Sequence, residues 1–422
     1  MRGEPLAIER IADWIHEDAP QVCPGDLASV ASVVAWSVIV EPGDVGYGIL
    51  RAACGSERGY ELLLHSSTAA EFVDSVAASR TGAAACSGLS AAELRALGEA
   101  WGRWRPRMDP ARVRGAIAAA GRLELRLFTP HHRWPQGLSD LGAHQPVCLW
   151  ARGRTSLSDA LLGHEHVLAV VGARAATAYG EYCAFELTGA AAREGALVLS
   201  GGAYGIDGAA HRAALALEGS TIAVLAGGVD RVYPRGHERL FEQIMDSGVI
   251  VSEVPPGTAP TRWRFLARNR VIAAWASATL VVEAGSRSGA LNTAHHALEL
   301  GRPLGAVPGP ITSATSRGCH RLIQEYAASC VTDPSDVEAL LGKHSGPSRR
   351  EDAAGDLVDA SHHPERTRVW DALSLRQPRY LEQIVRSSGV EARVAMSVLG
   401  ELEIAGAVIS RAGGWVKAPS GK

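Results

Sequence analysis

One stretch of the sequence, residues 261–270, concentrates side chains that bind phosphate or stack on bases. It reads TRWRFLARNR and contains four arginines and no acidic residue. A guanidinium offers a planar set of donors that matches phosphate oxygens, and an aromatic ring offers a face on which a base can stack. These residue types favour contact with single-stranded nucleic acid. Charge alone would favour the alternative, a solvated face with two apolar anchors.

The overall composition restricts any such site to a local surface. The chain has 422 residues, 46% of them hydrophobic, and a net charge of -3. This length and composition are typical of a globular protein with two or three domains. Because a slightly acidic chain does not attract a polyanion as a whole, nucleic acid would have to be bound by a local group of arginines.

Cysteine usage and hydropathy predict a cytoplasmic protein. The seven cysteines are odd in number, scattered and without a CxxC pair, which is typical of reduced thiols and of neither a disulfide framework nor a zinc site. No apolar run approaches the roughly 20 residues that a membrane span needs, and the first residues do not read as a signal peptide. We therefore expect no contact with a membrane.

Apolar runs that alternate with helical segments predict the central fold. Each run ends in a polar or glycine-rich turn, and helices separate the runs, which cover residues 167–171, 196–199, 221–225, 249–251, 278–282 and 303–307. Such a pattern specifies a parallel sheet covered on both faces. The expected fold class is α/β, with a doubly wound parallel sheet.

The ligand site of such a sheet lies beyond the carboxyl ends of the strands, where the strand order reverses. With the order 3-2-1-4-5-6, the crevice would lie between the first and fourth strands. It would be bordered by the loop 172–177, which contains Arg174, and by the segment 253–268, with a helix starting near Arg268. Arginines from these two segments would then lie together where a fold of this class binds its ligand. This convergence favours the nucleic-acid interpretation.

The flanking segments predict two helical parts. Residues 1–105 are alanine-rich, with helical segments at 7–15, 27–38, 69–78 and 91–104. The arginines that follow, Arg103, Arg105, Arg107, Arg112 and Arg114, are interpreted as a solvated linker face. Residues 343–364 have the composition of a flexible linker.

Residues 365–422 predict a winged helix, since three helical segments precede a two-stranded wing. The third helix carries Glu391, Glu401 and Glu403. Because helices that read the major groove are usually basic or amide-rich, a protein contact or a packing role is favoured over binding of duplex DNA.

The remaining polar motifs complete neither a catalytic site nor a metal site. SGGAYGID (200–207) forms an anion cradle or a set of tight turns but not a P-loop. Asp207 and His211 lie four residues apart without a nucleophile, so capping and side-chain pairing are favoured. Glu283 ends a strand, where a catalytic carboxylate could sit, and the paired histidines lack further ligands at metal spacing. We predict no catalytic residue, no metal and no cofactor.

Six motifs in one order resemble the DNA-processing protein A family, also called DprA or Smf. They are GARAATAYG (172–180), SGGAYGIDGAAH (200–211), AGGVDRVYP (226–234), SEVPPG (252–257), FLARNRVIA (265–273) and VVEAGSRSGALNTA (281–294). The resemblance implies a single-stranded DNA-binding recombination mediator without enzymatic activity. It also implies an extended Rossmann fold that dimerises, with RecA as a partner that is loaded onto incoming strands in natural transformation.

The resemblance also implies a set of DNA-binding residues. Arg174 matches a phosphate-binding arginine, and Phe265 matches an aromatic position. The full set is Gly172, Arg174, Ser200, Gly201, Gly202, Gly205, Arg262, Arg264, Phe265, Arg268, Asn269, Arg270, Ser288 and Gly289.

The predicted organisation is a SAM-like helical domain (1–105), an extended Rossmann single-stranded DNA-binding domain (106–342), a linker (343–364) and a winged helix (365–422). The rival prediction is a nucleotide phosphoribohydrolase of the lysine-decarboxylase-like Rossmann group. Such enzymes typically carry PGGxGTxxE, whereas this chain reads GSRSGALNTA without the final Glu. A protein that senses a nucleotide in the same crevice is a third possibility.

Overall fold

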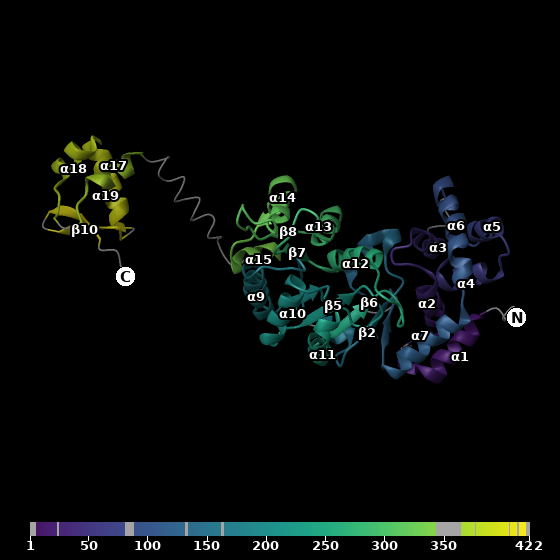
Figure 1. Ribbon diagram of the computed structural model, residues 1–422. Coiled ribbons are helices and arrows are strands. Elements are labelled where there is room, and N and C mark those ends of the chain that lie inside the picture. Colours follow the sequence, from purple (N-terminus) through teal and green to yellow (C-terminus); the bar gives the residue numbers. More distant parts are fainter. Residues whose placement is uncertain are drawn as a thin grey trace. The chain divides into compact units, whose positions relative to one another are not determined.

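The structure is a computed structural model that describes residues 6–22, 25–80, 88–130, 134–161, 164–342, 364–375, 377–404, 406–411 and 413–418. The chain divides into two compact units, Met1–Lys343 and His344–Lys422 (Figure 1). Apart from Pro364, the segment predicted as a linker lies outside the described residues.

The first unit begins with helices packed around buried aromatic rings. Trp36 lies at their centre, with its ring centroid 5.0 Å from that of Trp104 and 5.1 Å from that of Tyr47. The elements are α1 (Ile8–Asp18), η1 (Pro20–Val22), α2 (Leu27–Ile39), α3 (Val45–Cys54), α4 (Ser56–His65), α5 (Ala69–Ala78), α6 (Ala91–Trp104), η3 (Arg105–Arg107) and α7 (Pro110–Arg122). The helical N-terminal part is confirmed, although α3, α4 and α7 were not predicted. The glycines in α3 and α4 lower helix propensity, and tertiary packing of Tyr47 and Tyr60 compensates for them.

The centre of the first unit is a nine-stranded sheet among the described residues, in the order β1-β2-β6-β5-β4-β3-β7-β8-β9. The strands from β3 to β9 pair in parallel, while β2 pairs antiparallel with both β1 and β6. They are β1 (Arg126–Phe128), β2 (Leu149–Arg152), β3 (Val167–Val171), β4 (Leu197–Ser200), β5 (Thr221–Leu225), β6 (Val249–Ser252), β7 (Ala278–Val281), β8 (Leu304–Ala306) and β9 (Ser329–Cys330).

The strand order assumed from the sequence is wrong. The first parallel strand, β3, pairs with the second, β4, and with the fifth, β7; the fourth, β6, lies beyond β5. The crossover from β6 to β7 therefore passes over three strands, and the topological switch point lies between β3 and β7. Every parallel strand offers the same backbone hydrogen bonds, so apolar runs alone cannot specify which strand is its neighbour.

Helices cover both faces of the sheet. Along β3, Ala169 and Val171 belong to one core cluster and Leu168 and Val170 to another, because successive side chains point to opposite faces. The first cluster includes residues of α12 (Arg262–Trp275), α13 (Ala290–Glu299) and α14 (Arg317–Glu325). The second includes residues of α9 (Ala178–Arg193), α10 (Ile206–Ala216) and α15 (Pro334–Leu340). The remaining elements are η4 (Gln136–His144), α8 (Leu157–Leu161), η5 (Arg235–His237) and α11 (Glu238–Ser247).

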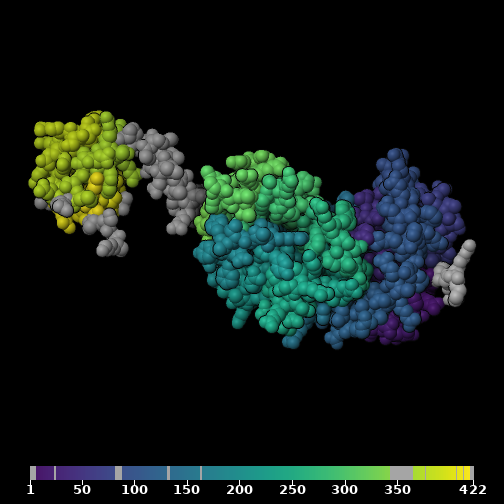
Figure 2. Space-filling view, viewed as in Figure 1, coloured from purple at the N-terminus to yellow at the C-terminus, as the bar shows by residue number. Residues whose placement is uncertain are grey.

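The N-terminal helices pack directly on the α/β part. A single core cluster contains Trp36 and Trp104 together with Phe241 of α11 and Ile250 of β6. The space-filling view shows the N-terminal helices in close contact with the α/β part of the first unit (Figure 2).

The second unit is the predicted winged helix. Helices α17 (Pro364–Ala372), α18 (Leu381–Ser388) and α19 (Ala392–Ile404) precede the antiparallel strands β10 (Val408–Arg411) and β11 (Gly414–Lys417). Its core includes Val369, Ile384 and Leu399, one from each helix.

Candidate nucleic-acid interface

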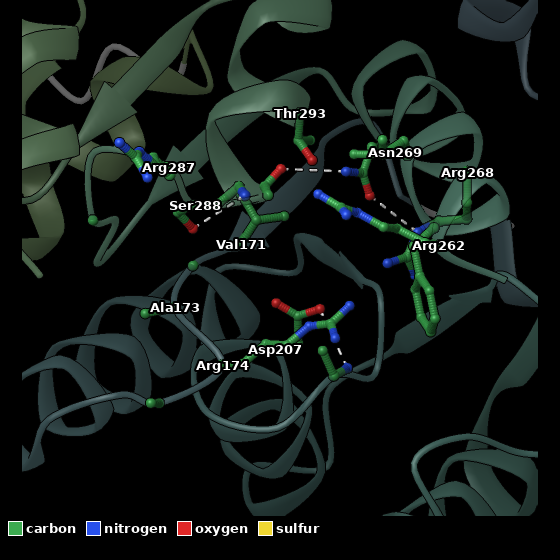
Figure 3. Close-up of a pocket in the computed structure, with 18 of the residues that line it drawn as sticks. Val171, Ala173, Arg174, Asp207, Arg262, Arg268, Asn269, Arg287, Ser288 and Thr293 are labelled. Carbon is green, nitrogen blue, oxygen red and sulfur yellow. Dashed lines mark hydrogen bonds between the residues drawn. The ribbon is translucent and has the colours of Figure 1, made fainter. Parts of the chain in front are cut away.

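A pocket of about 1110 Å³ opens at the switch point between β3 and β7. It is lined by the loop after β3, the first half of α12 and the loop after β7, and these supply eight of the predicted site residues: Gly172, Arg174, Arg262, Phe265, Arg268, Asn269, Ser288 and Gly289. Figure 3 shows Arg174 and Asp207 across the pocket from Arg262, Arg268 and Asn269. Arginines from the two predicted segments therefore lie around one pocket, as expected. The pocket lies between β3 and β7, and not between the first and fourth parallel strands as assumed.

Helix α12 begins six residues earlier than predicted, at Arg262 and not near Arg268. The Thr261 hydroxyl accepts a hydrogen bond from the Arg264 amide and so caps the helix. The arginines of this stretch therefore lie on one helix and point in different directions around its axis. Arg262 is exposed, whereas Arg268, Asn269 and Arg270 are buried.

An arginine and two aromatic rings lie against one another in the pocket lining. The guanidinium carbon of Arg174 lies 4.8 Å from the centroid of the Phe265 ring, and that ring lies 5.6 Å from Tyr233. All three residues line the pocket, and Arg174 and Tyr233 are exposed. An exposed guanidinium beside accessible ring faces can bind a phosphate and stack a base together.

Arg268 places a buried positive charge in the pocket wall. Its Nη1 donates to the carbonyl oxygen of Gly201 over 2.9 Å and to that of Val224. Burial lowers the pKa of Arg268 to about 10, against the opposing charge of Asp207, so the guanidinium stays protonated at neutral pH. Burial also raises the pKa of Asp207, while the charge of Arg268 and the amide of Ala203 oppose that rise.

Two predicted site arginines, Arg264 and Arg270, are engaged elsewhere and do not line this pocket. Arg264 binds Glu41 of the N-terminal helices through Nη2, over 2.9 Å. Arg270 forms a buried ion pair with Glu253, with a shortest N–O distance of 2.6 Å. Both side chains fix α12 to its surroundings and do not present free charge to a ligand.

The predicted glycine-rich loop at 200–205 packs against the residues that form the pocket. The Ser200 hydroxyl donates to the carbonyl oxygen of Val170, and the Gly202 carbonyl oxygen lies 3.1 Å from His237 Nδ1. Gly205 has φ +74°, and a Cβ there would lie 2.2 Å from the carbonyl oxygen of Ala173. Glycine is therefore required where this loop meets the loop after β3.

Asn269 connects α12 to the loop after β7. Its Nδ2 donates to the carbonyl oxygen of Gly289 over 3.3 Å and to Asn292 Oδ1 over 3.2 Å. Arg287 and Ser288 lie on the same loop and line the pocket.

Two acid–base candidates have structural partners. Glu283 is buried and accepts hydrogen bonds from the amide and hydroxyl of Thr177 and from the hydroxyl of Thr315, so it braces the loops around the pocket. His211 Nδ1 lies 2.7 Å from Thr221 Oγ1. The Thr221 hydroxyl already donates to the carbonyl oxygen of Val198, so Nδ1 carries the proton.

No cluster of three or more metal-ligating side chains occurs in the described part of the chain. No helix in that part is long and apolar enough to span a membrane.

Sequence reasoning missed Tyr233 and Arg287 as pocket residues. Tyr233 lies in the loop after the third parallel strand, and only the packed structure brings its ring to Phe265. Arg287 is exposed in a glycine-rich turn after a strand, and this combination could have identified it from the sequence.

The doubly wound sheet has a cationic, aromatic-lined pocket at its switch point, so this is an α/β protein whose pocket has the chemistry to suit an anionic ligand. Residues 126–342 match the model of the family described as DNA recombination-mediator protein A, and residues 353–414 match that of the DprA winged helix domain. The chain belongs to the DNA recombination-mediator protein A family, as its resemblance predicted. The members of this family are recombination mediators and not enzymes.

Individual relatives agree with this assignment. The chain is 45% identical over 301 residues to the putative DNA processing protein DprA of Mycobacterium tuberculosis, covering 69% of this chain and 76% of that protein. It is 38% identical over 261 residues to Protein Smf of Escherichia coli, covering 60% and 68%. The X-ray structure of DNA processing protein A from Streptococcus pneumoniae superposes with a TM-score of 0.55 at 30% identity, covering 74% of this chain and 96% of that chain. These comparisons confirm the predicted fold class and do not favour the phosphoribohydrolase alternative.

Proposed function

We propose that this protein binds single-stranded DNA in the pocket between β3 and β7 and acts as a recombination mediator. The observation that carries the proposal is the contact of Arg174 with Phe265 in the pocket lining, with Tyr233 beside the ring. Arg262, Arg268 and Arg287 add positive charge around the same opening. Membership of the family supports the DNA-related role.

Each residue of the predicted site has a part in this proposal. Arg174, Arg262 and Arg268 supply charge for phosphates, and Phe265 supplies a stacking face. The loops are tightly packed at four glycines, where an added Cβ would lie within 3 Å of a neighbouring atom: Gly172, Gly201, Gly202 and Gly205. Ser200 donates to the carbonyl oxygen of Val170, and Ser288 and Gly289 line the pocket. Asn269 holds the loop after β7, and Arg264 and Arg270 fix α12 without contacting DNA.

Fluorescence anisotropy of a labelled oligothymidine at two salt concentrations tests the proposal. Arg174→Ala should weaken binding by about 10- to 100-fold, as expected for a charge-assisted contact. Its salt dependence should also become shallower by about 0.7 log unit per log unit. The matched control is Arg193→Ala, which removes an exposed arginine outside the pocket lining. Absence of single-strand binding by the wild-type protein at low salt would refute the proposal.

We further propose that the protein protects incoming single strands and loads RecA onto them, in natural transformation or recombination, as a cytoplasmic homodimer joined through its α/β domain. Two pockets on one dimer would raise the effective concentration along a long strand. Assembly of RecA on DNA with and without this protein tests loading, and sedimentation of the free protein tests dimerisation. The division into folding units at residues 1–105, 106–342 and 365–422 belongs to the same proposal and is tested by limited proteolysis.

A further inference from the structure

A second pocket, of about 460 Å³, lies between α7 and the loop that joins β6 to α12. Arg112 and Arg122 of α7 line one side, and Arg231 and Arg264 line the other. The proposed function assigns no role to this pocket, which is called the α7 groove below.

The α7 side is an open trough with a positive charge at each end. Arg112, Gly115, Ala116, Ala119 and Arg122 share one helix face because they are spaced three, four, seven and ten residues from the first. The three middle residues are small, and a Cβ built on Gly115 meets nothing within 4 Å. The two arginines are separated by roughly 15 Å along the helix axis, a span that fits an extended ligand better than a single small anion.

Hydrogen bonds brace the opposite wall of the groove. The Gly257 amide donates to Asp230 Oδ1 over 2.8 Å, and the Gly228 amide donates to the carbonyl oxygen of Thr258 over 2.9 Å. Gly257 has φ +85°, a conformation that favours glycine. These contacts brace the loop from within the protein.

The charges of the groove leave two arginines free for a ligand. Glu41 neutralises Arg264, and Asp230, the acidic residue of the lining, lies 3.5 Å from Arg231. Arg112 and Arg122 make no hydrogen bond or ion pair with any other residue in the described ranges, and both are exposed. No aromatic residue lines the α7 groove. Its chemistry therefore suits phosphates and not bases.

The α7 groove adjoins the main pocket along the chain. Arg264 lines the groove, and the next residue, Phe265, lines the main pocket. Likewise, Ala259 lines the groove and Pro260 lines the main pocket. Since consecutive Cα atoms are about 3.8 Å apart, the two rims are close enough for one strand to contact both.

We propose that the α7 groove binds the phosphates of the strand segment that leaves the main pocket, with Arg112 and Arg122 as its contacts. One strand would then run from Arg174 past the 255–261 loop and onto α7. This inference rests on the proposed function, because it extends the same DNA site. The groove should bind without regard to sequence, since phosphates carry none.

Two oligothymidines test the inference, one of about 6 nucleotides that fills the main pocket and one of about 25 that can reach the groove. Arg112→Ala/Arg122→Ala should raise the dissociation constant of the long strand by about 10- to 100-fold and leave that of the short strand unchanged. The salt slope for the long strand should fall by about 1.4, which is two phosphates at about 0.7 each.

A second variant blocks the groove without removing charge. Gly115→Gln puts a side chain into open space and favours the helix, so the protein should fold. This variant should also weaken binding of the long strand and leave binding of the short strand unchanged. The control is Gly102→Gln on α6, where a Cβ likewise meets nothing within 4 Å and the groove is not involved.

The outcomes separate the two proposals. If the wild-type protein binds neither strand, the proposed function fails and this inference fails with it. If the wild-type protein binds the strands and both groove variants keep full affinity for the long one, the α7 groove inference alone is overturned. Equal weakening of the short and long strands would also overturn it, because the effect would then come from the main pocket.

Discussion

The guanidinium carbon of Arg174 lies 4.8 Å from the centroid of the Phe265 ring. Arg174 follows the first parallel strand, and Phe265 lies on the helix that crosses the sheet from β6 to β7. A cation over an exposed ring contributes about 0.5 to 1 kcal/mol, enough to orient the guanidinium. Its donors make no hydrogen bond to another residue within the described ranges, so they are free for a phosphate.

Removal of the Phe265 ring should separate the contribution of base stacking to DNA binding from the contribution of charge. We expect Phe265→Leu to weaken binding of oligothymidine by about 1 to 3 kcal/mol while the salt slope stays unchanged, because no charge is lost. The matched control is Trp263→Leu, since Trp263 is 60% exposed on the same helix but does not line the pocket. Anisotropy titrations measure both. Equal losses for the two variants would argue against a specific role for Phe265.

A methyl group at Gly201 should displace Arg268. A Cβ at Gly201 would lie 2.3 Å from Arg268 Nη1, which must then leave the carbonyl oxygens that it binds. We expect Gly201→Ala to lower the free energy of unfolding by about 1 to 3 kcal/mol and to weaken DNA binding. Gly102→Ala on α6 is the control, because a Cβ there meets nothing within 4 Å and Gly102 does not line the pocket. Urea unfolding that gives the same stability for both variants would contradict the expectation.

The attachment of the N-terminal helices to α12 should depend on pH. Burial raises the pKa of Glu41, but hydrogen bonds from Arg264 and Arg107 outweigh it and hold the pKa below its usual value of 4.5. A carboxylate with a depressed pKa stabilises the fold above the unfolded-state value and loses that contribution as the pH falls through the folded-state value.

Glu41→Gln should therefore cost about 1 to 2 kcal/mol at neutral pH, after allowance for solvent screening. The difference between wild type and variant should shrink as the pH falls below about 4.5. Unfolding curves at several pH values measure it. A difference that stays constant down to strongly acidic pH would exclude the ionised Glu41 as its source.

His211 should give a second pH dependence at higher pH. Burial lowers the pKa of His211 from 6.5 to about 3, with the charges of His237, Arg212 and Arg268 acting in the same direction. The unfolded chain therefore binds a proton below about pH 6.5 that the folded protein does not, so stability falls as the pH decreases from 6.5 towards 3.

At pH 5 this linkage should amount to about 2 kcal/mol. His211→Gln lacks it, so its free energy of unfolding should fall less steeply between pH 6.5 and pH 5 than that of the wild type. Parallel curves over this interval would show that the histidine does not titrate on unfolding.

The sequence by itself determined the central parallel strands and the residue types of the loops that follow them. Apolar runs with turns after them specified the six central parallel strands, because strands buried on both faces need continuous apolar residues. The arginine-rich stretch and the glycine-rich loops were recognisable as a candidate site because they follow strands of one parallel sheet, whose ligands bind beyond the carboxyl ends of the strands. Strand order was not determined, since the pairing of parallel strands uses backbone groups that are the same in each strand.

Only the tertiary structure decided which charges remain for a ligand. Arg262, Arg264, Arg268 and Arg270 share one short segment, yet Glu41, 223 residues from Arg264, neutralises that side chain, and Glu253 neutralises Arg270. Arg112 appeared in the sequence as one of five clustered arginines, but Arg103 pairs with Asp44 and Arg107 with Glu41, while Arg112 lines the α7 groove. The physical reason is that the partner of a charge depends on distances in space, and folding brings together residues that the sequence separates.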